Sequence, residues 1–198
     1  MSGFGVEIKN YIVRKALESD SDNIAKVLML SFEDTLSIFT KELDCFSKVF
    51  ENGILTDRFF VADENGEIIG VVACTDCNTG RAMKTTKSKC IKHLGAIRGR
   101  IAFRFICSDL MAQLPYPETT SYIDVVGVME KARGKGVAKE MLKTIIENNS
   151  QYDEFILEVD SINASAQKSY TDFGFVEFKR KQVFKFVKRY SIFMRYSV

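Results

Sequence analysis

Two glycines in a charged stretch, Gly134 and Gly136, are the first residues whose type and spacing could do chemistry. They follow the β-prone run SYIDVVGV at 121–128 and precede a segment with a helical pattern, and Arg133 and Lys135 stand beside them. A helix N-terminus offers unsatisfied backbone N–H groups and a partial positive charge, and glycine lets a ligand approach the backbone closely. The pattern therefore predicts an anion-binding loop.

Other kinds of glycine-rich loop fit this stretch less well. A Walker A loop requires GxxxxGK[ST], whereas Val137 and Ala138 follow Gly136 here. A dinucleotide-binding fingerprint requires GxGxxG, but Glu140 and Met141 occupy the region of its third glycine. From these residues alone, a tight β-to-α turn that binds nothing stays an open alternative.

A second polar segment follows the strand-like run FILEVD at 155–160. The two segments have the forms Arg133-x-x-Gly136-x-Ala138 and Asn163-x-x-Ala166-x-x-x-Tyr170-x-x-x-Gly174-Phe175. In this order, and joined by one helix and one strand, they resemble the GNAT superfamily of N-acetyltransferases. The resemblance covers about 121–178, and it leaves 79–119 unexplained.

The resemblance implies that the protein binds acetyl-coenzyme A as a co-substrate and needs no metal. In that family, the loop amides hold the pyrophosphate, and nearby cations such as Lys139 would add charge-assisted hydrogen bonds. The strand before the loop would pair its backbone with the pantetheine arm, in a slot opened where strands 121–128 and 155–160 splay apart. The expected cofactor-binding residues are Val126, Gly127, Val128, Arg133, Gly134, Lys135, Gly136, Val137, Ala138, Asn163, Ala166, Ser169 and Tyr170.

The resemblance also assigns catalytic roles. Tyr170 matches the usual general acid, which would protonate the leaving thiolate, and the backbone N–H of Val128 would polarise the thioester carbonyl. Asp124 is the base candidate, because it is the one ionisable residue in an otherwise apolar strand, where a polar side chain costs free energy unless it is used or satisfied. Packing of the tyrosine ring on the sheet, and a purely structural Asp124, are the alternatives.

The predicted activity is direct transfer of an acetyl group from acetyl-coenzyme A to a primary amine of a small molecule, peptide or protein. An alternative is a module that keeps the acetyl-coenzyme A site as a sensor or partner-binding surface without turnover. A third interpretation is nucleic-acid association through residues 80–119, which carry eight Lys or Arg against two acidic residues.

The whole chain has an ordinary globular composition, with 46% hydrophobic and 27% charged residues and a formal charge of +2. We expect one acyltransferase domain over 1–198 that acts as a monomer or homodimer, with no nucleic-acid or membrane partner. No apolar run is long enough to cross a bilayer. The five cysteines, an odd number in scattered contexts, fit reduced thiols and a cytoplasmic location.

The fold class predicted from the chain is mixed α/β with one central, mostly antiparallel sheet flanked by helices. Expected strands lie at 11–16, 58–63, 68–76, 121–128, 155–160, 175–187 and 190–196, and expected helices follow residue 20 and cover 40–52, 134–149 and 163–173. Asn65-Gly66 marks a hairpin turn between two of the strands.

Residues 79–119 are expected to insert one or two amphipathic helices before the cofactor-binding strand. We expect Leu94, Ile97, Ile101 and Phe105 to pack inward because they recur at roughly helical spacing. The basic side chains would then form a wall of the acceptor pocket that favours acceptors with negative charge; they are Lys92, Arg98, Arg100 and Arg104.

Overall fold

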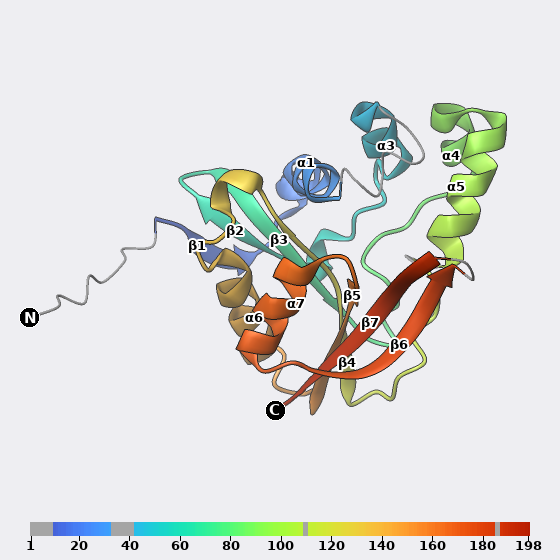
Figure 1. Cartoon of the computed structure of the whole chain (residues 1–198). Helices are drawn as coiled ribbons and strands as arrows, with labels where there is room; N and C mark the ends of the chain where they lie inside the picture. Colours follow the sequence, from blue (N-terminus) through green and yellow to red (C-terminus); the bar gives the residue numbers. More distant parts are fainter. Residues whose placement is uncertain (1–9, 33–41, 109–110, 185–186) are drawn as a thin grey trace, which may run out of the picture.

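The computed structural model describes residues 10–32, 42–108, 111–184 and 187–198. These residues form one seven-stranded sheet in the order β1-β2-β3-β4-β5-β7-β6 (Figure 1). Its strands are β1 (Ile12–Lys15), β2 (Phe59–Glu64), β3 (Glu67–Thr75), β4 (Thr120–Val128), β5 (Glu154–Asp160), β6 (Val176–Phe184) and β7 (Val187–Ser197). Neighbouring strands are antiparallel except β4 and β5, which are parallel. The predicted mixed, mostly antiparallel sheet is confirmed.

Helices cover both faces of this sheet (Figure 1). The helices α1 (Ser21–Ser31), α3 (Leu43–Val49), α4 (Lys87–Leu94) and α5 (Ala96–Ser108) lie on one side, and α6 (Val137–Glu147) and α7 (Ala164–Phe173) lie on the other. Residues 40 and 41, which the sequence assigned to a helix, and residues 185 and 186, which it assigned to a strand, lie outside the described residues.

Each face has its own hydrophobic core, because successive strand residues point to opposite sides of a sheet. On the α1 side, Val71 and Val125 pack with Ile24. On the α6 side, Val72 and Met141 belong to a second core with a larger set of residues from β4, β5, α6, α7 and β7. The two cores hold the central strands β3, β4 and β5 in place between the helices.

Glycines set two of the boundaries that matter for function. Asn65 and Gly66 both have positive φ, 54° and 89°, and close the β2–β3 hairpin as the sequence predicted. Gly134 and Gly136 also have positive φ, 74° and 75°. Since α-helical residues need negative φ, α6 begins at Val137 rather than at residue 134, the predicted start.

The segment between β3 and β4 contains α4 and α5, and these two strands are neighbours, as expected for an insertion. The predicted packing face of α5 is wrong. Leu94 is buried, but Ile97, Ile101 and Phe105 are 74%, 58% and 37% exposed.

Within the described residues, no helix is both long and apolar enough to span a bilayer.

Small residues explain why α5 buries the face opposite to the predicted one. Its buried residues are Gly99, Ala102 and Ile106. A Cβ on Gly99 would lie 2.4 Å from the carbonyl oxygen of Cys90, so this face can approach α4 only where side chains are absent or small. Because this small-residue face packs closely on α4, the larger residues Ile97, Ile101 and Phe105 are left on the exposed side of α5.

Candidate active site

A slot opens in the sheet where β4 and β5 stop pairing. Their register covers Thr120 to Ile123 of β4 and Glu154 to Leu157 of β5. Beyond these residues β4 continues along β3 to Val128, and β5 continues along β7 to Asp160. The two strands therefore diverge from the Ile123–Leu157 pair, and the slot widens toward the C-terminal ends of both strands.

A bulge in β4 lies at the narrow end of the slot. Cys74 of β3 pairs with Ile123, and the preceding Ala73 pairs with Val125, so Asp124 is the extra residue in β4. A bulge bends its strand and increases the local twist, which accounts for the departure of β4 from β5 at this position.

The free edge of β4 faces this slot. Met129 donates its N–H to the carbonyl oxygen of Ile69 on β3, so the peptide groups of Met129 point toward β3. Because these groups alternate along a strand, those of Val126 and Val128 point away from β3 and toward the slot. The Nε of Arg133 donates to the Val128 carbonyl oxygen at 3.2 Å. The N–H and C=O groups of Val126 and the N–H of Val128 could pair with the backbone of an extended chain.

The glycine loop stands at the wide end of the slot, between β4 and α6. A Cβ built on Gly134 or Gly136 would have no heavy atom within 4 Å, so both glycines border open space. Arg133 and Lys135 are exposed, while Val137 is buried and anchors the first turn of α6. The loop thus offers backbone amides, a helix N-terminus and two cations to an anion such as a pyrophosphate.

The predicted residues of the second segment lie in α7 or cap its N-terminus, beyond β5. Asn163 caps this helix by accepting a hydrogen bond from the Ala166 N–H at 3.1 Å. The hydroxyl of Ser169 is exposed and donates to the Ser165 carbonyl oxygen. Gln167 ties α7 to β5 by donating to the carbonyl oxygen of Asp160. The side-chain amide nitrogen of Asn163 is left available by the cap.

Gly127 lies on the opposite face of β4 from α6. A Cβ at this position would be 3.0 Å from the Ser31 hydroxyl oxygen at the end of α1, so glycine allows α1 to approach the bulged strand. That hydroxyl is buried and has no hydrogen-bond partner among the described residues.

Tyr170 projects from α7 into the core on the α6 side. It is 8% exposed, and its ring packs edge-on against Phe175 with centroids 6.1 Å apart. Burial raises the pKa of its hydroxyl to about 12. None of the described residues forms a hydrogen bond with this hydroxyl. Burial therefore keeps the phenol protonated at neutral pH.

Asp124 accepts hydrogen bonds from two residues at the start of the segment between β3 and β4. Its carboxylate accepts hydrogen bonds from Arg81 Nε at 2.5 Å and from the Ala82 N–H at 2.6 Å, and its side chain is 2% exposed. Burial raises the pKa of the carboxyl, while Arg81 and the Ala82 amide favour the ionised form. This arrangement ties the start of the insertion to the bulge.

The structure brings a second carboxylate, Glu158, to the same end of the slot. Glu158 is the first β5 residue beyond the last β4–β5 pair, the position that Asp124 holds on β4. The Tyr122 hydroxyl lies 3.5 Å from its Oε2. Tyr122 in turn stacks on Tyr116, with centroids 6.0 Å apart, and carries the Arg81 guanidinium 4.9 Å from its ring centre. The sequence signal for Glu158 is weaker than that for Asp124, because the run FILEVD contains a second carboxylate, Asp160.

Comparisons with known proteins agree with this geometry. The sequence profile of the acetyltransferase (GNAT) family matches residues 30–175. No curated protein matches the sequence.

Many solved structures share the fold. An N-acetyltransferase from Staphylococcus aureus Mu50 is 17% identical with a TM-score of 0.63, over 93% of this chain and 100% of that one. A structure described as histone acetyltransferase HPA2 and related acetyltransferase, from Corynebacterium glutamicum, is 19% identical with a TM-score of 0.64, over 93% and 94%. An acetyltransferase from Salmonella typhimurium, solved with its cofactor acetyl-CoA, is 18% identical with a TM-score of 0.58, over 96% and 94%.

The family profile spans most of the chain, and it includes the slot, the glycine loop and α7. On this evidence the chain belongs to the GNAT family of acetyltransferases.

Proposed function

We propose that the protein is a cytoplasmic N-acetyltransferase that transfers the acetyl group of acetyl-coenzyme A directly to a primary amine. The observation that carries this proposal is the alignment of the slot with the glycine loop. The unpaired edge of β4 at Val126 and Val128 leads from the narrow end of the slot to the loop at its wide end. A molecule with an extended amide-containing arm and a pyrophosphate has the shape and chemistry for this site.

The loop sets the direction in which acetyl-coenzyme A binds. Backbone amides from Arg133 to Ala138 and the N-terminus of α6 hold the phosphates at the wide end. The pantetheine arm then runs along Val128 and Val126 as an added strand, with the Asn163 amide on its far side. Its thioester end consequently lies toward the bulge, where Asp124 and Glu158 are found.

Acetyl-coenzyme A supplies an activated acetyl group, and the residues around the slot supply position and protons. The amine nitrogen forms a bond to the acetyl carbon, and the bond between that carbon and sulfur breaks. Because the thioester end lies toward the bulge, the nearest slot-facing N–H is that of Val126; this group, rather than the Val128 N–H expected from the sequence, donates to the carbonyl oxygen, which gains negative charge. Tyr170 gives its proton to the leaving thiolate, because burial keeps the phenol protonated. Holding both substrates in one slot supplies much of the acceleration.

The amine must lose a proton, and two carboxylates stand at the narrow end. Asp124 is the base candidate from the sequence, and it would act through a water molecule. Glu158 is a candidate from the structure, and it is half-buried rather than enclosed. Removing each carboxylate in turn, as Asp124→Asn and Glu158→Gln, assigns the role to the residue whose loss shifts the pH dependence of kcat/KM.

Two measurements on the purified protein test the proposed function. Calorimetry should show binding of acetyl-coenzyme A, and a thiol-release assay over a chemically diverse amine panel should show turnover with a subset of primary amines. Binding without turnover on any amine, with no effect of Tyr170→Phe, would indicate the non-catalytic sensor instead. Absence of binding would contradict the site assignment itself.

A further inference from the structure

The outer face of α5 carries an exposed apolar stripe. Ile97, Ile101 and Phe105 follow one another at intervals of four residues, so they lie along one side of the helix. They are 74%, 58% and 37% exposed, on the side opposite the buried residues Gly99 and Ala102. A run of three bulky apolar side chains on one exposed helix face differs from apolar residues scattered singly over a surface.

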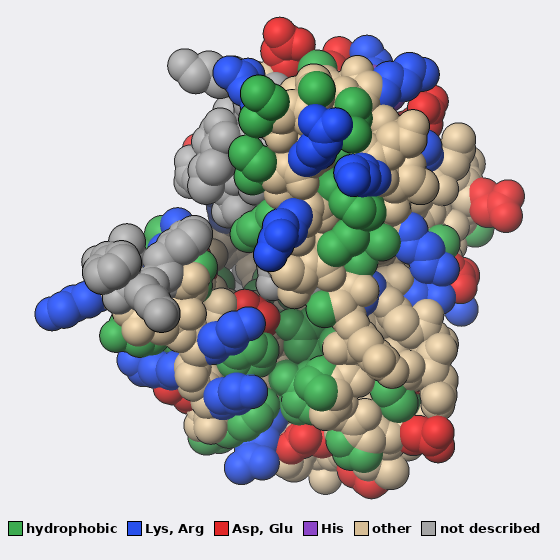
Figure 2. Space-filling view, turned by 90° about the vertical axis from the view of Figure 1, so that its right-hand side faces the viewer, with side chains coloured by type: hydrophobic (Ala, Val, Ile, Leu, Met, Phe, Trp, Pro, Cys, Tyr) green, Lys and Arg blue, Asp and Glu red, His purple; other side chains and the backbone are tan. Residues whose placement is uncertain are grey.

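Basic side chains border this stripe on both sides. Arg100 and Arg104 each precede a stripe residue by one position, and Arg98 follows Ile97 by one, so the arginines flank the stripe to left and right. From residue 87 to 108 the chain has six Lys or Arg and no Asp or Glu. None of these six forms an ion pair within the described part of the chain. Figure 2 shows this side, with Lys and Arg side chains interspersed among hydrophobic ones in its upper part.

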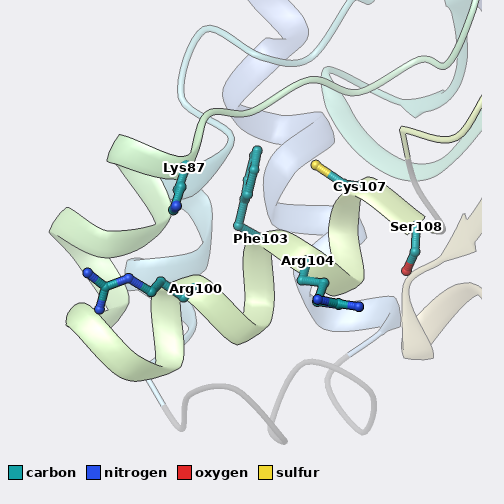
Figure 3. A pocket seen from close by; sticks show the side chains of 6 residues that line it. All are labelled: Lys87, Arg100, Phe103, Arg104, Cys107 and Ser108. Carbon is teal, nitrogen blue, oxygen red and sulfur yellow. The ribbon is translucent and has the colours of Figure 1, made fainter.

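A groove runs along one flank of α5, beside the stripe (Figure 3). Its volume is about 570 Å³, and Lys87 from α4 stands across it from α5. Phe103 and Cys107 give it apolar walls, and Arg100 and Arg104 add two cations. Three cations around an apolar groove suit an anionic group that is attached to a hydrocarbon chain.

We propose that the outer face of α5 docks on an anionic lipid surface. Acyl chains would receive Ile97 and Ile101, while the flanking arginines extend to the headgroups and Lys87 helps to hold one of them. Each basic side chain near such a surface adds attraction, and the cytoplasmic leaflet is the anionic one. The helix would lie on the membrane and not cross it, which agrees with its length of 13 residues.

Other binding partners would match only some of the features of this face. A nucleic acid would neutralise the arginines but leave Ile97 and Ile101 in water. A second copy of the chain, face to face, would bring two sets of unpaired cations together. The expectation from composition that the protein has no membrane partner rested on the absence of a long apolar run, and that criterion does not detect an interfacial helix.

Co-sedimentation of the full-length protein with vesicles tests the proposal. Vesicles of phosphatidylcholine alone should bind weakly, and vesicles that also contain phosphatidylserine should bind strongly, with a loss of affinity as salt rises. The double variant Ile97→Ser/Ile101→Ser should lose about tenfold or more in vesicle affinity. The control Ile12→Ser removes an isoleucine of similar exposure, 64%, from β1 and should bind like the wild type.

Both variants should keep the wild-type thermal stability and the wild-type affinity for acetyl-coenzyme A, so that a loss of vesicle binding cannot be assigned to unfolding. Failure to bind phosphatidylserine vesicles would overturn the proposal and leave this face to an acidic protein surface. Undiminished binding of the double isoleucine variant would also overturn it, because the stripe would then play no part. The assay needs no turnover, so its outcome does not depend on the proposed function.

Discussion

Replacing Tyr170 with Phe removes one proton donor and little else. The pKa of about 12 means that at pH 8 about one phenol in 10⁴ is ionised, so essentially every enzyme molecule can donate in the wild type. We expect kcat to fall by about ten-fold to a thousand-fold, the usual contribution of a positioned acid. No described residue hydrogen-bonds the hydroxyl, and Phe keeps the ring contact with Phe175, so stability should change by less than about 1 kcal/mol.

Tyr196→Phe is the matched control for this change. Its ring belongs to the same aromatic group, with its centroid 5.6 Å from that of Phe175, but it comes from β7 instead of α7. Steady-state thiol release should give a reduced kcat for Tyr170→Phe and a wild-type value for Tyr196→Phe. Calorimetry should give the wild-type Kd for acetyl-coenzyme A in both variants, since neither hydroxyl holds the phosphates.

The pH profile adds a second readout for the same residue. Because burial raises the pKa of Tyr170, the acid form is complete below this pKa and is lost only as pH rises through about 12. Between pH 7 and 9 the phenol therefore stays protonated, so ionisation of Tyr170 should not lower kcat in the wild type. The shape of the pH profile in this range should be the same for the wild type and Tyr170→Phe. An unchanged kcat in Tyr170→Phe, under conditions where solvent viscosity has no effect on turnover, would refute the assignment and make Tyr170 a packing residue.

Three further predictions concern the loop, the second carboxylate and acid stability. Gly136→Asp should abolish acetyl-coenzyme A binding in calorimetry, because a carboxylate would occupy the phosphate position; Gly95→Asp, at another positive-φ glycine in open space, should bind normally. Glu158→Gln should lower kcat/KM for the acceptor by about tenfold or more and leave the Kd for acetyl-coenzyme A unchanged; a changed Kd would place this residue in the cofactor site. The hydrogen bond with Arg14 lowers the pKa of Asp20, so its contribution to stability is present above the ordinary carboxyl pKa and is lost as pH falls through the folded value. In denaturant titrations Asp20→Asn should therefore be less stable by about 1.5–3 kcal/mol at pH 7 and should lose less stability on acidification than the wild type.

Features fixed by short stretches of chain could be predicted from the sequence. The hairpin turn at Asn65-Gly66 depends on local conformational preferences, and the structure confirms it with positive φ at both residues. The order of strands and helices followed from periodicity in the same way. The start of α6 was placed three residues early, because the pattern of apolar residues does not show which loop residues have positive φ.

The orientation of α5 could not be predicted from periodicity alone. Its sequence contains two stripes at helical spacing, one bulky (Ile97, Ile101) and one small (Gly99, Ala102). A rule that buries the larger apolar residues chooses the first stripe. The structure buries the second, because the close approach to the Cys90 carbonyl requires the absence of a side chain. This requirement arises from a tertiary contact between α5 and α4, which the spacing of apolar residues within α5 does not reveal.

The partners of the site carboxylates were also beyond the sequence. Arg81 lies 43 residues before Asp124, and the register of β4 against β5 decides that Glu158 stands level with it. Each carboxylate could be noticed as a charge in an apolar strand. Their convergence on one end of a slot depends on a parallel strand pair that ends after four residues, a property of the assembled sheet.

The insertion joins this site through its two ends rather than through its helices. Arg81, close after β3, binds Asp124 and covers one side of the Tyr122 ring, while Tyr116, close before β4, stacks on the same ring. Tyr122 thus contacts residues from both ends of the insertion and places its hydroxyl beside Glu158.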